Sequence, residues 1–372
     1  MRVCSRCVMD SSDSKIQFDD LGYCDHCNGF LADVAPYWDN SNDHKRLMSI
    51  ADRIKRKSTG EYDCILGLSG GLDSSLLLHV AVKMMKLKPL VFHVDGGWNT
   101  DIAVSNIKNL VSQLGLDLFT EVIDWQDMKD FQLALFKSGT PHLDLAQDHA
   151  FFATMLKFAN KYDIKFILNG GNFATECIRN PLEWIYYGTD MTFIKDVLKK
   201  HCQSNLRNYP WSSIYYGKIY LKYFKGISVV RPLNHIKYIK NDAEKMLATN
   251  YGWRGYGQKH FESRFTKFYE GYWMPERFGF DTRKVQYSSL IMTGQMSRDE
   301  ALRQLQLPPY PASESATDFQ FVADKLGISV DELSELMRLP LKNFRDFKNE
   351  EWVFRLGALA LKLLGHERAI KR

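Results

Sequence analysis

The sequence lacks any apolar run long enough to cross a membrane. The longest apolar stretch in its first third covers residues 76–82, far short of the ~18 residues that a spanning helix needs. Its first residues, Met1 to Cys4, contain no apolar segment of the kind found in secretory signals. We therefore expect a cytoplasmic protein that has no membrane partner.

The chain also lacks a strong excess of charge. Its 372 residues include 49 Lys and Arg and 44 Asp and Glu, a net charge of +5. This balance is too mild for a protein that coats nucleic acid, and it suits an anionic small substrate. Hydrophobic residues make up 45% of the chain and charged residues 25%, which excludes disorder, collagen and coiled coil as descriptions of the whole. The length predicts two or three domains.

Seven cysteines are an odd count, and four of them form two tight pairs. Cys4 and Cys7 are one pair, Cys24 and Cys27 the other, each with two residues between them. This spacing is typical of a structural zinc site, in which four thiolates complete a tetrahedron. We predict that Zn²⁺ holds residues 1–30, which have too little apolar mass to fold alone. Redox or unliganded pairs and an iron–sulfur centre are the alternatives.

Apolar runs alternate with helical stretches from residue 62 onward. The runs cover residues 63–68, 90–94, 118–123, 165–168 and 227–230, and the main helical stretches cover 74–86, a segment ending near 114, and 146–161. This alternation predicts an α/β fold with a parallel sheet, whose ligands bind at the carboxyl ends of the strands. Beyond about residue 236 no further strand is visible, and capping-box spacing at Ser297 and Ser329 predicts helices there.

The loop after the first strand carries the most specific pattern, LSGGLDSS at residues 68–75. Its glycines let the backbone approach a phosphate, and its amides and the following helix N-terminus face the anion. Serine hydroxyls add donors, and Asp73 can hold Mg²⁺ or orient the loop. The pattern is not a Walker A motif, because Gly-x4-Gly-Lys-Ser/Thr is absent. The predicted phosphate-binding residues are Ser69, Gly70, Gly71, Asp73, Ser74 and Ser75.

Two further strands end in glycine-bearing loops. Asp95 follows the second strand, and Gly170 and Asn172 follow the fourth. At the carboxyl edge of the sheet these residues are candidates for nucleotide or magnesium contacts. Ordinary turn residues are the alternative interpretation.

The pattern Ser69-Gly70-Gly71-x-Asp73-Ser74 resembles the pyrophosphate loop of the PP-loop ATP pyrophosphatases. Members include asparagine, GMP and NAD synthetases and tRNA-thiolating enzymes. The resemblance implies Mg²⁺-dependent cleavage of ATP to AMP and pyrophosphate, with AMP placed on a substrate oxygen that ammonia or sulfur then displaces. We accordingly predict a PP-loop domain at residues 59–235, a Cys4 module at 1–30, a helical connector at 31–58 and a helical substrate or partner region at 236–372.

A narrower resemblance covers almost the whole chain. HVDGGWN at 93–99, NGGN at 169–172, KHFESRFTKF at 259–268 and SSLI at 288–291, together with the cysteine pairs, are similar to the N-acetyl sugar amidotransferases of surface-polysaccharide and nonulosonic-acid pathways. The resemblance implies that ATP drives conversion of an acetamido group on a sugar, often a nucleotide sugar, into an acetamidino group, as in lipopolysaccharide O-antigen biosynthesis. It also implies a separate glutaminase subunit, often with a cyclase-like companion. We see no glutaminase-sized segment in this sequence.

The segment 259–267 carries charges at helical spacing. The resemblance implies that it forms a clamp over substrate or pyrophosphate, with Arg283 and Lys284 as possible additions; an exposed, ion-paired helix is the alternative. His149 is expected to be a structural histidine rather than a base. The predicted catalytic residues are Asp73, Lys259, His260, Glu262 and Arg264.

Two other functions are considered. A tRNA-thiolating enzyme would share the loop and often needs a catalytic cysteine pair. Cys177 and Cys202 are the candidates, but their spacing is not diagnostic, and no basic stripe for tRNA is visible. Residues 321–339 have a pattern similar to a helix-turn-helix. Their second helix is acidic, however, with Asp331 and Glu332, and this suits a phosphate backbone poorly. We therefore expect no nucleic-acid partner.

Overall fold

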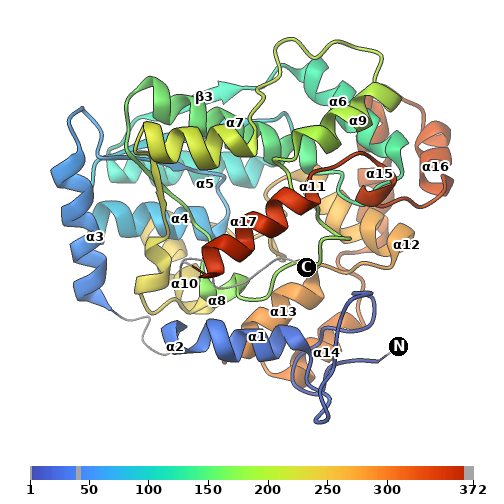
Figure 1. The fold of residues 1–372 in the computed structure, drawn as a ribbon, viewed down its shortest axis with the longest axis horizontal. Coiled ribbons are helices and arrows are strands. Elements are labelled where there is room, and N and C mark those ends of the chain that lie inside the picture. Colours follow the sequence, from blue (N-terminus) through green and yellow to red (C-terminus); the bar gives the residue numbers. More distant parts are fainter. Residues whose placement is uncertain (1, 39–42, 364–372) are drawn as a thin grey trace.

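The computed structural model describes residues 2–38 and 43–363 (Figure 1). Five parallel strands form one sheet in the order β3-β2-β1-β4-β5. The strands are β1 (Cys64–Gly67), β2 (Pro89–Asp95), β3 (Leu118–Val122), β4 (Phe166–Leu168) and β5 (Ser228–Val230). Each lies within or next to one of the five apolar runs, so the predicted α/β fold with a parallel sheet is confirmed.

Helices cover both faces of this sheet. Leu66 and Val91 pack against α3 (His44–Lys57), α4 (Leu72–His79), α5 (Asp101–Leu114) and α10 (Lys240–Tyr251). Ile65, Leu90 and Phe92 face the other way, toward α7 (Leu145–Lys161) and the π-helix η2 (Tyr215–Phe224). Burial on both faces explains why the central strands are continuous apolar runs rather than alternating ones.

The largest core lies beyond the carboxyl edge of the sheet and joins N-terminal to C-terminal segments. It contains Trp98, Trp184 and Trp273, all nearly inaccessible to solvent. After β5 the described chain contains helices and no further strand, as expected. None of its helices has the length and apolar character needed to span a membrane. The remaining elements are α1 (Asp25–Asp33), α2 (Ala35–Trp38), η1 (Val80–Met84), α6 (Trp125–Ser138), α8 (Phe173–Glu176), α9 (Met191–His201), η3 (Pro232–His235), α11 (Arg264–Phe268), η4 (Tyr269–Trp273), α12 (Met274–Phe278), α13 (Arg283–Met292), α14 (Arg298–Leu305), α15 (Ala312–Leu326), α16 (Val330–Arg338), η5 (Phe344–Asp346) and α17 (Glu351–Leu363).

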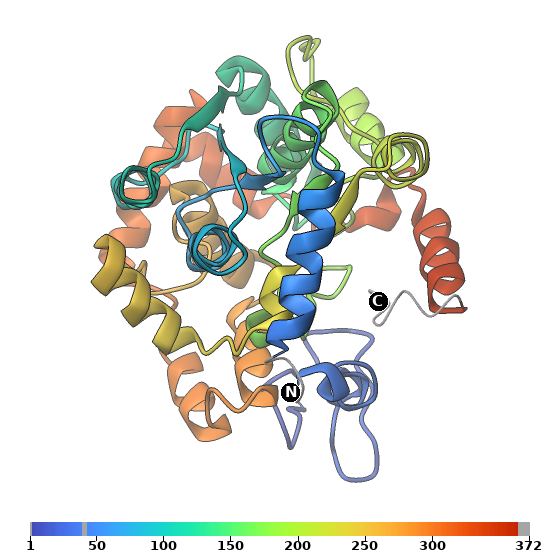
Figure 2. The ribbon, with the colours of Figure 1, turned by 90° about the vertical axis from the view of Figure 1, so that its left-hand side faces the viewer.

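The N-terminal segment is fastened to the C-terminal helices. Both views place it beside α13 and α14 (Figures 1 and 2). The Arg298 guanidinium donates to the carbonyl oxygens of Cys4 at 2.9 Å and Cys7 at 3.1 Å. Lys284 pairs with Asp10 at 2.7 Å, so this lysine anchors the module and is not part of a clamp over substrate.

Candidate functional site

The glycine loop joins β1 to α4 at the carboxyl edge of the sheet. Gly70 has a φ of +83°, and a Cβ there would lie 2.8 Å from the backbone oxygen of Ala103. Its carbonyl accepts hydrogen bonds from Trp253 Nε1 at 2.9 Å and Tyr256 Oη at 2.8 Å. Only glycine fits this position, and the distant aromatic residues hold the loop in shape.

The serines of the loop divide between pocket and core. The hydroxyl oxygens of Ser69 and Ser74 lie 3.1 Å apart, and both residues line the pocket described below. Ser75 is fully buried, and its hydroxyl has no hydrogen-bond partner among the described residues. Ser69 and Ser74 therefore present their hydroxyls to the cavity, whereas Ser75 lies behind the loop.

Within the loop, the Asp73 carboxylate has several hydrogen-bond and ion-pair partners. Its Oδ1 accepts from Tyr238 Oη at 2.5 Å and from Asn172 Nδ2 at 3.0 Å, and its Oδ2 lies 3.0 Å from Lys259 Nζ. Burial alone would raise the pKa of Asp73, but the Lys259 ammonium and the hydrogen bonds keep the pKa below its usual value. The carboxylate is therefore ionised at neutral pH.

Lys259 joins three segments of the chain. Besides Asp73, its ammonium contacts Glu176 Oε1 at 2.6 Å and Thr175 Oγ1 at 3.2 Å. Burial would lower the pKa of Lys259, but the two carboxylates raise it above its usual value. Asn172 shapes the same corner, because its Oδ1 caps α8 by accepting from the Thr175 backbone N–H at 2.9 Å.

A cavity of about 400 Å³ opens over this loop. Its walls come from the loop, from Gly170 and the end of α8, from residues 238–244, from the segment 253–262 and from α13. The lining includes Ser69, Gly71, Asp73, Ser74, Gly170, Glu176, Tyr238, Lys240, Glu244, Trp253, Tyr256, Gln258, Lys259, His260, Glu262, Gln286, Tyr287 and Leu290.

Glu262 lies directly over the glycine loop. A Cβ on Gly71 would come within 2.4 Å of its Oε1, and that oxygen accepts from Ser69 Oγ at 3.2 Å. The Glu262 backbone oxygen accepts from the Thr100 N–H at 3.0 Å, which ties this segment to the loop after β2. Glu262 and Asp73 both line the cavity and carry carboxylate oxygens of the kind that Mg²⁺ prefers, so they are the residues that would hold a magnesium ion beside the loop.

His260 also lines the cavity. It has a φ of +68°, uncommon for a side chain of this size, and its Nδ1 lies 3.1 Å from Glu270 Oε1. Burial would lower the pKa of His260, but the Glu270 carboxylate raises it to about 9. The imidazole therefore carries a positive charge at neutral pH.

Five predicted site residues do not line the cavity: Gly70, Ser75 and Asn172, which lie behind it, and Arg264 and Asp95. The Arg264 guanidinium stacks on Phe321, and its Nε donates to Asp318 at 2.7 Å, so it holds α15. Asp95 accepts from the Gly97 N–H at 2.7 Å and stabilises the turn after β2. The structure gives Arg264 and Asp95 local structural contacts instead of positions in the pocket.

His149 and Arg283 are structural as well. The two ring nitrogens of His149 bond to the Gly188 carbonyl at 2.6 Å and to the Ser212 N–H at 3.0 Å. Arg283 pairs with Asp281 at 2.6 Å and donates to two backbone carbonyls.

The sequence reasoning missed several residues that build the site: Glu176, Tyr238, Trp253, Tyr256 and Tyr287. The density of aromatic residues between 251 and 256 is the one sequence signal for Trp253 and Tyr256, which hold the loop through the Gly70 carbonyl. Glu176 and Tyr238 carried no comparable signal.

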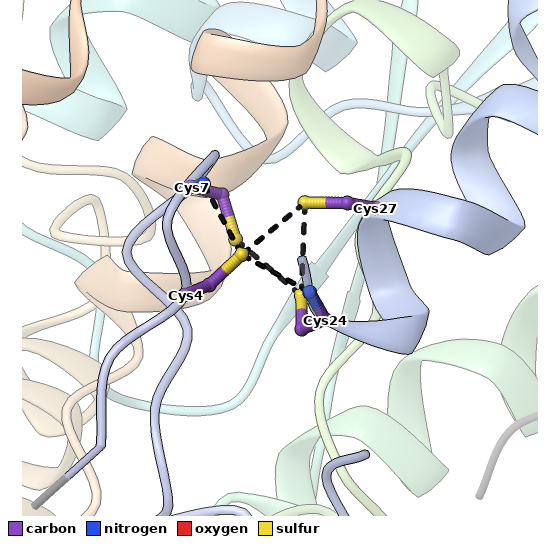
Figure 3. Close-up of side chains that lie close together, drawn as sticks. All are labelled: Cys4, Cys7, Cys24 and Cys27. Atoms are coloured by element: carbon purple, nitrogen blue, oxygen red, sulfur yellow. Dashed lines mark hydrogen bonds between the residues drawn. The ribbon is translucent and has the colours of Figure 1, made fainter. Parts of the chain in front are cut away.

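The four paired cysteines meet at one point (Figure 3). All four are fully buried, and their sulfur atoms lie within 4.8 Å of one another. The Cys4–Cys27, Cys7–Cys24 and Cys24–Cys27 distances are 3.8, 3.6 and 3.6 Å. Sulfurs at about 2.3 Å from one tetrahedral ion lie ~3.8 Å apart, so the cluster fits a single metal ion.

Comparison with protein families gives one match. Residues 262–359 match the C-terminal domain of LPS biosynthesis proteins that are similar to WbpG. The matched segment begins at Glu262, in the wall of the cavity. This finding supports the resemblance to enzymes of surface-polysaccharide biosynthesis.

Individual relatives are more distant. The uncharacterised protein MJ1599 of Methanocaldococcus jannaschii is 22% identical over 317 residues, which cover 83% of this chain and 94% of that protein. Among solved structures, the NH3-dependent NAD synthetase of Campylobacter jejuni has a TM-score of 0.30 at 18% identity, covering 57% of this chain and 84% of its own. The U34-tRNA thiolase NcsA of Methanococcus maripaludis, which holds a [4Fe-4S] cluster, has a TM-score of 0.32 at 14% identity, covering 92% and 90%. Both scores are low, so the description of the fold rests on the sheet and loop of this chain.

Proposed function

We propose that the protein is an ATP-dependent amidotransferase that converts the acetamido group of a sugar, in particular a nucleotide-linked sugar, into an acetamidino group. The observation that carries this proposal is the SGGLDSS loop, which opens into a cavity whose opposite wall begins the segment similar to LPS biosynthesis proteins. The loop supports activation by ATP, and the family match supports a sugar of a surface polysaccharide as the acceptor.

The chemistry proceeds in two steps. The amide oxygen of the acetamido group attacks the α-phosphorus of ATP, and the bond to pyrophosphate breaks, which gives an O-adenylated imidate. Ammonia then adds to the imidate carbon and loses protons to the surroundings, and AMP departs with the former amide oxygen. Adenylation supplies the good leaving group that an amide lacks.

The residues of the cavity bind and orient the reactants. Ser69, Ser74 and the loop amides receive the pyrophosphate portion of ATP, and the cationic Lys259 stabilises the charge that develops on it. Asn172 and Tyr238 fix Asp73, which in turn fixes Lys259. Mg²⁺, when bound at Asp73 and Glu262, would supply further positive charge next to the phosphates.

The same proposal extends to the other components. Zn²⁺ in the Cys4 site is the ion that best suits four buried thiolates at these distances. A separate glutaminase subunit, with or without a cyclase-like companion, supplies the ammonia. We place the reaction in the cytoplasm, where thiolates of this kind persist in reduced form.

Sulfur transfer to tRNA is the alternative function, and the two candidate cysteines have environments that do not favour it. Burial raises the pKa of the Cys177 thiol to about 12, and its S–H points to the Ser289 carbonyl. Neither Cys177 nor Cys202 lines the cavity over the loop. A thiol with a raised pKa is a poor nucleophile.

The proposal is tested with purified protein, ATP, Mg²⁺, ammonium and a panel of UDP- and CMP-linked N-acetyl sugars. We expect sugar-dependent AMP and pyrophosphate, and a sugar product in which NH replaces one oxygen, detected by mass spectrometry. The variant Asp73→Asn should lose about 100-fold or more of AMP formation. AMP formation that is equal with and without every sugar would contradict the proposed acceptor, and an active Asp73→Asn would contradict the loop assignment.

A further inference from the structure

Two helices on one side of the molecule expose apolar side chains to solvent. Figure 2 shows η2 in yellow and α17 in red on its right-hand side. Of the eighteen large hydrophobic residues that are exposed in the described chain, five lie on η2 and three on α17. They are Tyr215, Ile219, Tyr220, Tyr223, Phe224, Trp352, Leu356 and Leu359. The two helices thus hold a disproportionate share of the exposed apolar surface.

These side chains are arranged as helix faces. On α17 they recur at spacings of four and three residues, which places them on one stripe of an α-helix. On η2 they recur at spacings of four and five, the period of a π-helix, while Leu221 points into the core. Tyr223 and Phe224 are 69% and 76% exposed. Such faces are costly to leave in water, which points to a partner.

The start of η2 and the residue that precedes α17 line a common cavity. Its volume is about 930 Å³, and its lining includes Tyr215 of η2 and Glu350, the residue before α17. Thr192 of α9 holds Glu350 through a hydrogen bond of 2.8 Å. Lys157 and Lys195 also line this cavity. It is separate from the cavity over the phosphate loop, because the two share no lining residue.

Positive charge is interleaved with the aromatic residues. The sequence of η2, YYGKIYLKYF, contains two lysines and no carboxylate, and Lys225 follows it directly. Lys218, Lys222 and Lys225 are all exposed. The ammonium groups of Lys222 and Lys225 lie 5.1 Å and 6.0 Å from the ring centres of Tyr223 and Tyr220. The positive charges of η2 therefore lie beside its exposed aromatic rings.

This composition distinguishes among kinds of partner. Protein interfaces are depleted in lysine. Single-stranded nucleic acid stacks on aromatic rings but gains nothing specific from aliphatic side chains such as Ile219, Leu356 and Leu359. Lysines beside tyrosine, tryptophan and leucine on an amphipathic helix are typical of segments that lie in the headgroup region of a membrane.

We propose that η2 and α17 form a surface that binds an anionic lipid bilayer. The aromatic and aliphatic side chains enter the boundary between headgroups and acyl chains, and the lysines contact lipid phosphates. This peripheral binding needs no spanning helix. It revises our expectation that the protein has no membrane partner, which rested on the absence of an apolar segment, and it does not depend on the proposed reaction.

The test is co-sedimentation of the full chain with vesicles of phosphatidylcholine alone or of phosphatidylcholine mixed with phosphatidylglycerol. We expect binding to the anionic vesicles that weakens at high salt. The double variant Tyr223→Ser, Phe224→Ser should reduce the partition coefficient about tenfold or more, because two exposed apolar side chains are lost. Leu307→Ser, at a 59% exposed residue outside both helices, is the matched control and should bind like the unaltered protein.

The proposal would be overturned by no binding to anionic vesicles, by equal binding to neutral ones, by equal loss in the control, or by a concentration-dependent dimer that the double variant abolishes. Preference for single-stranded RNA over vesicles would also overturn it. Circular dichroism and ATP binding confirm that each variant is folded, and both should be unchanged because the altered side chains are exposed and lie outside the cavity over the loop.

Discussion

At the scale of single residues, the site depends on one lysine that contacts two carboxylates. Replacement of Lys259 by Met leaves Asp73 and Glu176 close together without their common cation. Because the same ammonium is proposed to stabilise the charge that develops on pyrophosphate, and loss of one such group costs about 100-fold or more, we expect kcat/KM for AMP formation to fall by about 100-fold.

Lys267→Met is the matched control for this prediction. Lys267 lies on the same segment but pairs with Glu314 and Asp318 on α15, so its loss should leave AMP formation within about twofold. Equal effects of the two substitutions on AMP formation would mean that Lys259 acts only through folding.

His260 gives the protein a pH-dependent stability. Its pKa is raised from 6.5 to about 9 by Glu270, so the folded state binds the proton more tightly than the unfolded chain does. The resulting stabilisation is fully present below pH 6.5 and is lost as the pH rises toward 9. The effect is modest, because the side chain is 43% exposed.

The variant His260→Asn tests this effect, because asparagine tolerates the positive φ of +68°. In urea unfolding, the advantage of the unaltered protein over the variant should be largest near pH 6 and should shrink between pH 6.5 and 9. If the difference in unfolding free energy between the two proteins stays constant over this range or grows with pH, the ion pair between His260 and Glu270 does not stabilise the fold through charge.

At the scale of elements, the loop between β1 and α4 is constrained by its backbone. Gly70→Ala adds a Cβ at a φ of +83° and 2.8 Å from a backbone oxygen that cannot move freely. Gly115 has a similar φ of +64°, but a Cβ there would have no atom within 4 Å. Gly115→Ala therefore introduces backbone strain without a steric contact. We expect Gly115→Ala to lower the free energy of unfolding by about 1–2 kcal/mol.

Gly70→Ala should cost more in urea unfolding than Gly115→Ala and should also weaken ATP binding, measured by calorimetry. The reason is that the Gly70 carbonyl also holds Trp253 and Tyr256, so a displaced loop disturbs the cavity wall. If the two variants lost the same free energy of unfolding, the contact between the new Cβ and Ala103 would have no energetic effect, which would contradict the prediction.

The elements that could be predicted from sequence are those with strong local patterns. Continuous apolar runs identify β1 and β2, and the glycine loop is identified by its residues. What could not be predicted is the contact between Ser69 and Glu262, which lie 193 positions apart. Arg264 could not be placed from sequence either. It belongs to the same charged segment as Lys259, but the packing of α15 directs it to Asp318 and away from the cavity.

At the scale of the whole molecule, the cysteine cluster stabilises more than its own segment. The Val8 N–H donates to Ser288 Oγ at 3.3 Å, and Arg298 binds two carbonyls of the cluster. Helix α13 also carries Gln286 and Tyr287 of the cavity wall. The cysteine cluster and the cavity over the loop therefore share one helix, through which a bound metal ion would stabilise the cavity wall.

Metal analysis should find about one equivalent of zinc per chain. Removal of the metal with a chelator should lower the melting temperature and weaken ATP binding, and re-addition of Zn²⁺ should restore both. Cys27→Ser should reproduce the effect without a chelator. A melting temperature that is insensitive to both treatments would contradict a structural metal, and stoichiometric iron and sulfide would contradict zinc.

The central claim is that the amide oxygen of the sugar is activated by adenylation. The most direct measurement places an isotopically heavy oxygen in the acetamido group and follows it by mass spectrometry during turnover with ATP and ammonium. We predict that the label appears in AMP and disappears from the sugar product. Label that stays in the sugar, or that enters pyrophosphate, would contradict the proposed reaction.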